Sequence, residues 1–167
     1  MKMAGFYDES ISNGLGWRAV LFVSGCPHHC PGCHNQEAQN FNYGQEFNKQ
    51  EILDRISENS ILKGITISGG EPLCKENIAD VVDFIKDVKK IKPNFNVWCY
   101  TGYTIEELMD HNDEITKEAI DQIDVLVDGR FKQEQKDPTL KFRGSKNQRI
   151  IDLKSTSHVH KIIELPV

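Results

Sequence analysis

Five short runs of mostly apolar, β-branched or aromatic residues recur along this chain, separated by longer polar stretches. They lie at residues 18–24, 64–68, 96–100, 123–127 and 149–153. None of them alternates cleanly between apolar and polar residues, which is typical of strands that are covered on both faces. The runs therefore predict five strands within a layered fold.

Several of the intervening stretches have the period of amphipathic helices. Residues 49–58 and 77–90 place apolar side chains three and four positions apart, as a helix with one buried face requires. The side chains predicted to point inward are Ile52, Leu53 and Ile56 in the first helix, and Ile78, Val81, Val82, Ile85 and Val88 in the second. Thr104 and Glu107 have the spacing of a capping box, which predicts a third helix after the third strand. Repeated strand-then-helix units predict an α/β fold with a parallel sheet, either open or curled into part of a barrel.

Length and composition fit a single domain spanning residues 1–167, with no linker, repeat or low-complexity segment. The formal net charge of -5 argues against a nucleic-acid partner, because phosphates are neutralised by clustered Lys and Arg. The longest apolar run near the start, residues 19–23, is too short for a signal segment or a membrane span. We therefore expect a cytoplasmic protein that binds neither nucleic acid nor membrane.

The first four predicted strands each end beside a chemically distinctive segment. Parallel α/β folds bind their ligands beyond the carboxyl ends of the strands, which lie along one edge of the sheet. The segments are, in chain order, Cys26, then Gly69-Gly70-Glu71, then Thr101-Gly102-Tyr103, and finally Asp128-Gly129-Arg130. This placement predicts one binding site assembled from all four.

Three of the five cysteines, Cys26, Cys30 and Cys33, fall within eight residues. Pro27 and Pro31 discourage a helix between them, so the thiols are expected in a loop that can wrap a compact inorganic group. A 4Fe-4S cluster is normally held by four cysteine thiolates. With three local thiols, one iron would lack a protein ligand and could bind a substrate directly.

A structural zinc site is the alternative for this loop, with His28, His29 or His34 completing a tetrahedron of ligands. Cys74 and Cys99 stand apart from the loop. We predict that both are small buried apolar residues, because free cysteine is among the most buried residue types.

The CxxxCxxC spacing that follows the first strand resembles the signature of the radical S-adenosylmethionine superfamily. In that superfamily the open iron of a 4Fe-4S cluster chelates the amino and carboxylate groups of S-adenosyl-L-methionine. One electron from the cluster then releases a 5'-deoxyadenosyl radical. The resemblance implies the same two cofactors here, with no catalytic side chain beyond the three cluster ligands.

Gly69-Gly70-Glu71 resembles the GGE motif of that superfamily, which holds the ammonium of the methionine moiety; an ordinary turn is the alternative. Members usually carry an aromatic or hydrophobic residue before the third cysteine, where this chain has glycine. The resemblance therefore implies that adenine rests on the backbone of Gly32, Cys33 and His34. Position at the carboxyl ends of the predicted strands favours further cofactor contacts, for which the candidates are Asn35, Thr101, Tyr103, Asp128 and Arg130. An ordinary strand-to-helix loop is the alternative for Thr101 and Tyr103. A surface ion pair is the alternative for Asp128 and Arg130.

Most of the chain is similar to one branch of the superfamily, the anaerobic ribonucleotide reductase activating proteins. The matching stretches are GWR, LFVSGCPHHCPGCHN, ISGGEPL, YTGYTIEEL, VLVDGRF and FRGSKNQRIID, and Trp17 is a minor departure. The branch implies a parallel sheet curled into a partial, incomplete β/α barrel, whose wide mouth suits a protein substrate. It also implies that the chain takes a hydrogen atom from a glycine of an anaerobic ribonucleoside-triphosphate reductase and leaves a glycyl radical there. The electron would come from a low-potential donor such as a flavodoxin.

Arg143, Lys146 and Arg149 form the most basic local stretch, which we expect either to dock the partner's glycine loop or to be a solvated face. Other functions stay open at this point. Activation of another glycyl radical enzyme, such as pyruvate formate-lyase, would use similar CHN and GGEP motifs. Functions of a different class are a non-catalytic iron-sulfur electron carrier and a zinc-binding interaction module.

Overall fold

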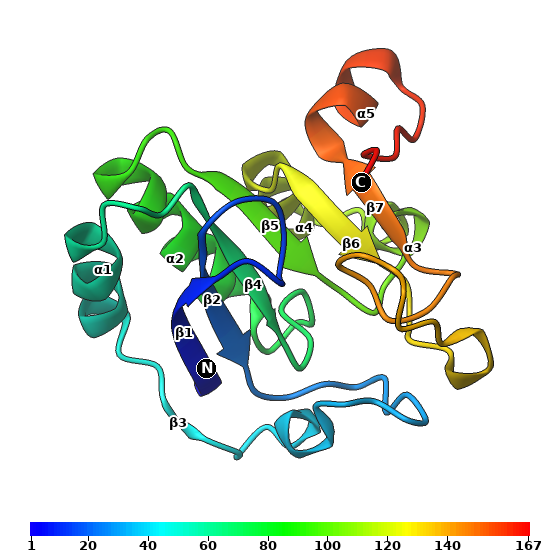
Figure 1. The fold of residues 1–167 in the computed structure, drawn as a ribbon, viewed down its shortest axis with the longest axis horizontal. Coiled ribbons are helices and arrows are strands. Elements are labelled where there is room, and N and C mark those ends of the chain that lie inside the picture. Colours follow the sequence, from blue (N-terminus) through cyan, green and yellow to red (C-terminus); the bar gives the residue numbers. More distant parts are fainter.

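One seven-stranded sheet runs through the protein in the order β3-β1-β2-β4-β5-β6-β7 (Figure 1). The computed structural model describes all residues from 1 to 167. The strands are β1 (Lys2–Ser10), β2 (Arg18–Val23), β3 (Gln45–Glu46), β4 (Gly64–Gly69), β5 (Asn96–Tyr100), β6 (Val125–Asp128) and β7 (Arg149–Asp152). The five predicted strands are all present, within two residues of their expected ends.

The sheet is mixed, so the prediction of a parallel sheet is wrong at both edges. β2, β4, β5 and β6 run parallel to one another, whereas β1 is antiparallel to β2 and β3, and β7 is antiparallel to β6. The connections explain this, because parallel neighbours need a crossover and antiparallel neighbours do not. Residues 11–17 form a short hairpin loop between β1 and β2, and residues 129–148 join β6 to β7 without an α-helix. The strand order leaves the sheet open, with β3 and β7 at its two edges.

Five α-helices accompany the sheet: α1 (Lys49–Glu58), α2 (Ile78–Ile91), α3 (Ile105–His111), α4 (Glu114–Gln122) and α5 (Leu153–Val159). The two 3-10 helices are η1 (Gln36–Gln39) and η2 (Gln133–Gln135). The first two α-helices confirm the periodic stretches, and the apolar side chains predicted to point inward are all buried. The capping box at Thr104 and Glu107 is also confirmed, at the start of α3. No helix has the length and apolar character that crossing a membrane requires.

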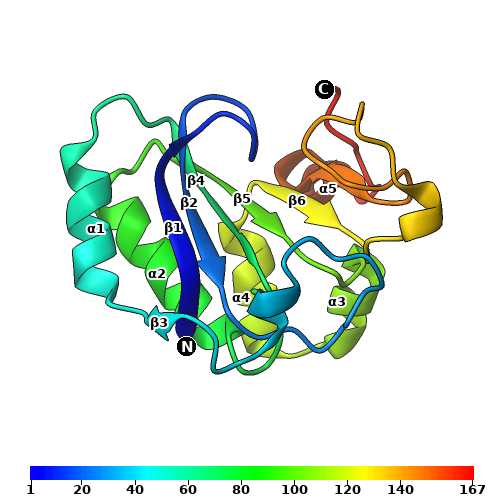
Figure 2. The ribbon, with the colours of Figure 1, turned by 60° about the horizontal axis from the view of Figure 1, so that its bottom comes forward.

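Helices α1, α2 and α4 cover one face of the sheet (Figure 2). Alternate strand residues such as Leu21, Ile67 and Cys99 pack against them in one large core. Cys99 and Cys74 are both buried, which confirms the prediction for these two thiols. The remaining strand residues point to the other face. Trp98, with neighbours from β6 and β7, forms a second, smaller core there.

That second face is covered by loops, and a buried arginine holds one of them in place. The guanidinium of Arg18 donates to the carbonyl oxygens of Leu15, Ile65 and Asn96 and to Oγ1 of Thr66, at 2.6–3.1 Å. It is fully buried and has no carboxylate partner, and burial lowers the pKa of this guanidinium to about 10. These bonds fasten the 11–17 hairpin loop over the amino ends of the parallel strands. The carboxyl ends on the same face are left open.

Candidate functional site

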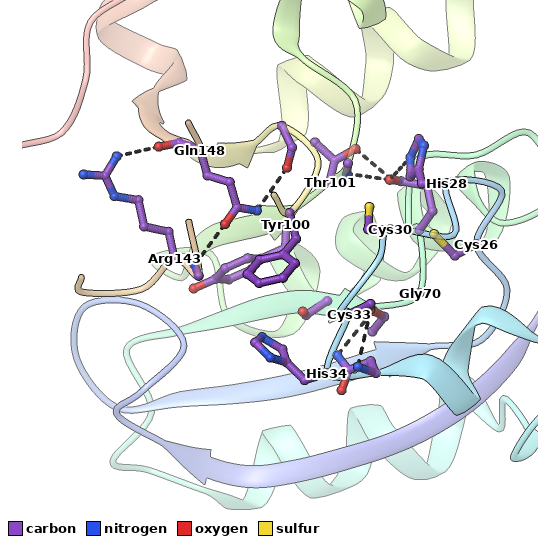
Figure 3. A pocket seen from close by; sticks show the side chains of 18 of the residues that line it. Cys26, His28, Cys30, Cys33, His34, Gly70, Tyr100, Thr101, Arg143 and Gln148 are labelled. Atoms are coloured by element: carbon purple, nitrogen blue, oxygen red, sulfur yellow. Dashed lines mark hydrogen bonds and ion pairs between the residues drawn. The ribbon is translucent and has the colours of Figure 1, made fainter. Parts of the chain in front are cut away.

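A cavity of about 600 Å³ opens on the helix-free face of the sheet, at the carboxyl ends of the parallel strands. Figure 3 shows Cys26 and Cys30 near His28 at one end, Cys33 beside His34 nearer the middle, and Arg143 and Gln148 at the other end. The predicted site residues that line the cavity are Cys26, Cys30, Cys33, His34, Asn35, Gly69, Gly70, Glu71 and Thr101. The structure therefore brings together segments that lie far apart in the sequence. Gly32, Tyr103, Asp128 and Arg130 are outside the lining.

The cysteine loop carries three free thiols that are partly buried. It folds back on η1, since the amide N–H groups of Gly25 and Cys26 donate to the carbonyl oxygens of Ala38 and Gln39. Burial raises the pKa of the Cys26 thiol to about 11, and it also raises the pKa of Cys30. Metal ligands must be thiolates, so metal binding at this loop would release protons.

The donor set fits an iron-sulfur cluster. Three soft sulfur ligands from one loop face one cavity, and no disulfide consumes them. No three Cys, His, Asp or Glu side chains of the protein lie close enough together to hold one metal ion. A four-iron cluster does not need ligands this close together, because each thiolate binds a separate iron atom.

Glu71 lies at the centre of the hydrogen-bond network below the cysteines, and its side chain is fully buried. Oε1 accepts hydrogen bonds from the amide N–H of Leu73 at 2.9 Å and from the hydroxyl of Thr101 at 2.7 Å. Oε2 lies 2.7 Å from both the amide nitrogen of Gly102 and Nε2 of His28. The carboxylate therefore joins three segments of the chain. His28, which the sequence suggested only as a zinc ligand, instead contacts this carboxylate.

The turn at residues 69–72 is fastened to the start of the cysteine loop. The amide of Gly70 donates to the carbonyl of Val23, and that of Glu71 to the carbonyl of Gly25, both at 2.8 Å. The side-chain amide of Asn77 donates to the carbonyls of Ser24 and Glu71, each at 3.0 Å. Sequence reasoning did not identify Asn77 as part of the site. No sequence signal marks it, because its burial and its contacts depend on how the turn folds against the cysteine loop.

Asp128 and Arg130 do not pair with each other. Asp128 is buried, accepts a hydrogen bond from the amide of Ile105, and pairs with Arg149. The carboxylates of Asp128 and Glu106 raise the pKa of Arg149. Arg130 pairs with the carboxylate of Glu107 at 3.0 Å. The Arg130 pair holds the 129–148 connection against α3, whereas the pair of Asp128 with Arg149 joins β6 to β7.

Tyr103 also lies beside the cavity rather than in it. Its ring packs edge to face with those of His28 and His111, with centroids 4.5 and 5.3 Å apart. Burial raises the pKa of its hydroxyl to about 12. The structure thus places Tyr103 in contact with the histidine that reaches Glu71.

The far half of the cavity was not predicted from the sequence. Aromatic side chains from β5 and the 129–148 connection line it, together with polar and charged groups of that connection: Tyr100, Phe142, Lys136, Asp137, Arg143 and Gln148. Tyr7 of β1 and Phe22 of β2 also line the cavity, in the neighbourhood of Cys33 and His34. Of the basic stretch, Arg143 lies here and Lys146 is exposed, whereas Arg149 is engaged with acidic partners. These aromatic residues lie far apart in the sequence, so no local motif predicts that they line one cavity.

Comparison with known proteins agrees with this geometry. Residues 12–151 match the family model described as a 4Fe-4S single cluster domain. A protein of Escherichia coli (strain K12) named anaerobic ribonucleoside-triphosphate reductase-activating protein is 39% identical over 153 residues, covering 89% of this chain and 97% of that protein. Proteins of the same name from Haemophilus influenzae and Enterobacteria phage T4 are 40% and 36% identical. They cover 90% and 86% of this chain, and 97% and 89% of their own lengths.

Proposed function

This chain belongs to the family of anaerobic ribonucleoside-triphosphate reductase-activating proteins, and from that premise we propose that it places a glycyl radical on such a reductase. The chemistry would use a 4Fe-4S cluster held by Cys26, Cys30 and Cys33 together with S-adenosyl-L-methionine. The observation that carries the proposal is that all three thiols and the Gly69-Gly70 turn line one cavity. Family membership supports the partner, and the cavity supports the cofactors.

Held by Cys26, Cys30 and Cys33, a reduced 4Fe-4S cluster would supply the one electron needed to cleave S-adenosyl-L-methionine into methionine and a 5'-deoxyadenosyl radical. Transfer of a hydrogen atom from the partner's glycine to that radical would give 5'-deoxyadenosine and the glycyl radical. A low-potential donor such as a flavodoxin would return that electron. The residues of this chain bind and orient the reactants and restrict water. None of them needs to act as a general acid or base.

The Gly69-Gly70 turn and Asn35 are proposed to hold the methionine moiety. A Cβ atom on Gly70 would lie 2.4 Å from the carbonyl oxygen of Gly25, so backbone packs tightly there and only glycine fits. The side-chain amide of Asn35 reaches the carbonyl of Gly69 at 3.5 Å, and both residues line the cavity. We place adenine against Cys33 and His34, next to Gly32. Thr101 completes this wall through its bond to Glu71.

The far, aromatic half of the cavity is proposed to receive the glycine-bearing segment of the reductase. We interpret β2, β4, β5 and β6 as part of an incomplete barrel whose interior is the cavity. An open barrel admits a protein segment that a closed one would exclude. We also propose a cytoplasmic location, since the five cysteines are all free and reducing compartments keep thiols reduced.

The test is anaerobic reconstitution of the protein with iron and sulfide, followed by reduction in the presence of S-adenosyl-L-methionine and the reductase. Electron paramagnetic resonance should show a glycyl radical on the reductase, together with release of 5'-deoxyadenosine. Pyruvate formate-lyase as the added partner should acquire no radical. Failure to release 5'-deoxyadenosine from protein with a full complement of iron and sulfide would overturn the proposal.

Cysteine variants provide the matched control. Cys33→Ala removes a thiol at the cavity, and we expect it to abolish both the radical and the release of 5'-deoxyadenosine. Cys99→Ala removes a fully buried thiol on the helix-covered face of the sheet. It should cost about 1 kcal/mol of stability and leave the reaction intact.

A further inference from the structure

The carboxylate of Glu71 has no free acceptor position. An ionised carboxylate offers about four lone-pair sites to donors. In this protein all of them face groups of the chain itself: Leu73, Thr101, Gly102 and His28. The side chain is also fully buried. An ammonium group that approached from the cavity would have to displace one of these donors.

His28 is the only one of these donors that belongs to the cysteine loop. It lies between two of the thiol-bearing residues, Cys26 and Cys30, and its side chain is only 5% exposed. The imidazole packs against the edge of Tyr103 and ends 2.7 Å from Glu71. This hydrogen bond joins the segment between Cys26 and Cys30 to the turn that follows β4.

The neighbouring loop leaves room for this imidazole. A Cβ atom on Gly102 would lie 2.4 Å from Cδ2 and 2.7 Å from Nε2 of His28. Any other residue at position 102 would therefore push the ring away from Glu71. Gly102 also donates its amide to the same carboxylate. Gly102 thus supports the contact between His28 and Glu71 in two ways. It leaves space for the imidazole, and its amide binds the same carboxylate.

We propose that Glu71 acts as a positioning residue for the cluster, holding the segment between Cys26 and Cys30 through His28, and not as the ligand of the methionine ammonium. Besides His28, an exposed hydrogen bond between Nδ1 of His29 and Oε1 of Gln39, at 3.2 Å, holds the segment between Cys26 and Cys30. The rest of the loop is fastened near its ends, by backbone bonds to Ala38 and Gln39 and by the short turn from Cys30 to Cys33. Groups that orient metal ligands commonly change metal retention by about ten- to a hundred-fold when they are removed. This inference rests on the cluster of the proposed function and is independent of the partner protein.

The test compares neighbouring histidines in the anaerobically reconstituted protein. In His28→Asn the shorter side chain cannot reach Glu71. In His29→Asn an exposed side chain, whose hydrogen-bond partner is the exposed Gln39 side chain, is changed in the same way. Asparagine tolerates the left-handed backbone at position 29, where φ is 50°. We expect His28→Asn to lose iron to a chelator about ten-fold faster than the wild type, with altered resonance of the reduced cluster. His29→Asn should match the wild type in both measurements.

Two further variants separate positioning from loss of folding and from ammonium binding. His28→Gln keeps an N–H donor that can reach the carboxylate, so it should recover most of the iron retention. Glu71→Gln should lose iron at least as fast as His28→Asn, because one side-chain amide cannot keep every contact of the carboxylate with His28, Gly102, Thr101 and Leu73. The double variant should be no worse than Glu71→Gln alone, because the His28 contact depends on Glu71.

The proposal is overturned if His28→Asn retains iron like the wild type, or if His28→Gln fails to improve on it. It is also overturned if Glu71→Gln keeps its iron and only requires more S-adenosyl-L-methionine to perturb the resonance of the reduced cluster. That result would assign the ammonium to Glu71. These measurements need no reductase, so they stand apart from failure to form a glycyl radical.

Discussion

Arg18 shows how much one buried side chain contributes to the face that carries the cavity. Replacing it by methionine keeps the apolar stem but leaves the carbonyls of Leu15, Ile65 and Asn96 without their donor. Buried acceptors without partners cost about 1–3 kcal/mol each, partly relieved by entering water. We expect Arg18→Met to lower the free energy of unfolding in urea by about 2–4 kcal/mol.

Arg55 is the matched control because it forms an exposed bidentate pair with Asp8. Exposed pairs contribute about 1 kcal/mol or less, so Arg55→Met should cost little. Equal losses in the two variants would mean that the Arg18 network contributes no more than a surface pair.

Gly70 is required because no side chain fits at its position, where the backbone packs against the cysteine loop. A Cβ atom there would meet the carbonyl oxygens of Gly25 and Ala38 at 2.4 and 2.7 Å, and backbone cannot move aside as a flexible side chain can. Gly70→Ala should therefore separate the glycine turn from the cysteine loop. We expect a loss of stability of about 1–3 kcal/mol and at least a two-fold loss of bound iron after reconstitution.

Gly5→Ala provides the comparison for this prediction. The nearest atom to its added Cβ is 3.9 Å away, on the side chain of Phe22. This variant should retain its iron and unfold at nearly the same urea concentration as the wild type. Similar iron loss in both variants would show that the contacts of Gly70 do not matter.

At the scale of elements, two glutamates in the first turn of α3 are expected to make the stability of the protein depend on pH under acidic conditions. The hydrogen bond to the backbone of Thr104 lowers the pKa of Glu107, and pairing with Arg149 lowers that of Glu106, in both cases below the ordinary value of 4.5. A carboxylate whose pKa is lower in the folded state than in the unfolded state stabilises the protein at pH values above the unfolded-state pKa. This contribution is lost as the pH falls through the folded-state pKa. The free energy of unfolding should therefore fall as the pH is lowered below about 4.5.

The double variant Glu106→Gln and Glu107→Gln tests this dependence in iron-free protein by urea unfolding at about pH 6 and about pH 3.5. Glutamine preserves the capping-box hydrogen bond but does not titrate. The drop in stability between the two pH values should be smaller in the variant than in the wild type. Glu114→Gln, at an almost wholly exposed side chain at the start of α4, serves as the control. An unchanged drop in the double variant would contradict the assignment to α3.

The elements that the sequence predicted are those with strong local signals. The helix at 49–58 has both an apolar face and an asparagine cap, and α3 has its capping box. β1 was missed because exposed, charged residues such as Asp8 and Glu9 interrupt its apolar pattern, as expected for a strand near the edge of a sheet. α4 and α5 were missed because neither has a capping box like that of α3, although α4 is longer than α3 and α5 is equally long.

For the molecule as a whole, the sequence predicted the residues at the carboxyl ends of the parallel strands but not the loops that surround the cavity. The cysteines, the glycine turn and Thr101 follow parallel strands, and their meeting at one cavity follows from that topology. The 11–17 hairpin loop and the 129–148 connection depend on antiparallel strands at the two edges of the sheet, which no local motif marked. The pairing of Arg149 with Asp128 and Glu106 likewise depends on how β7 returns beside β6.

One face of the sheet is covered by helices, and the other carries the cavity that is proposed to receive the reductase. Arg143 lines this cavity and Lys146 is exposed on the same connection, so both would contact a reductase docked there. We expect Arg143→Glu with Lys146→Glu to weaken binding of the reductase about ten-fold, or about 1.4 kcal/mol, with a smaller effect at high salt.

Lys90→Glu with Lys117→Glu makes the same change of charge on the helix-covered face and should leave the affinity unchanged. Titration of the reductase at about 0.05 M and about 0.5 M salt measures both pairs. Equal weakening by the two pairs would mean that net charge, and not this surface, governs docking.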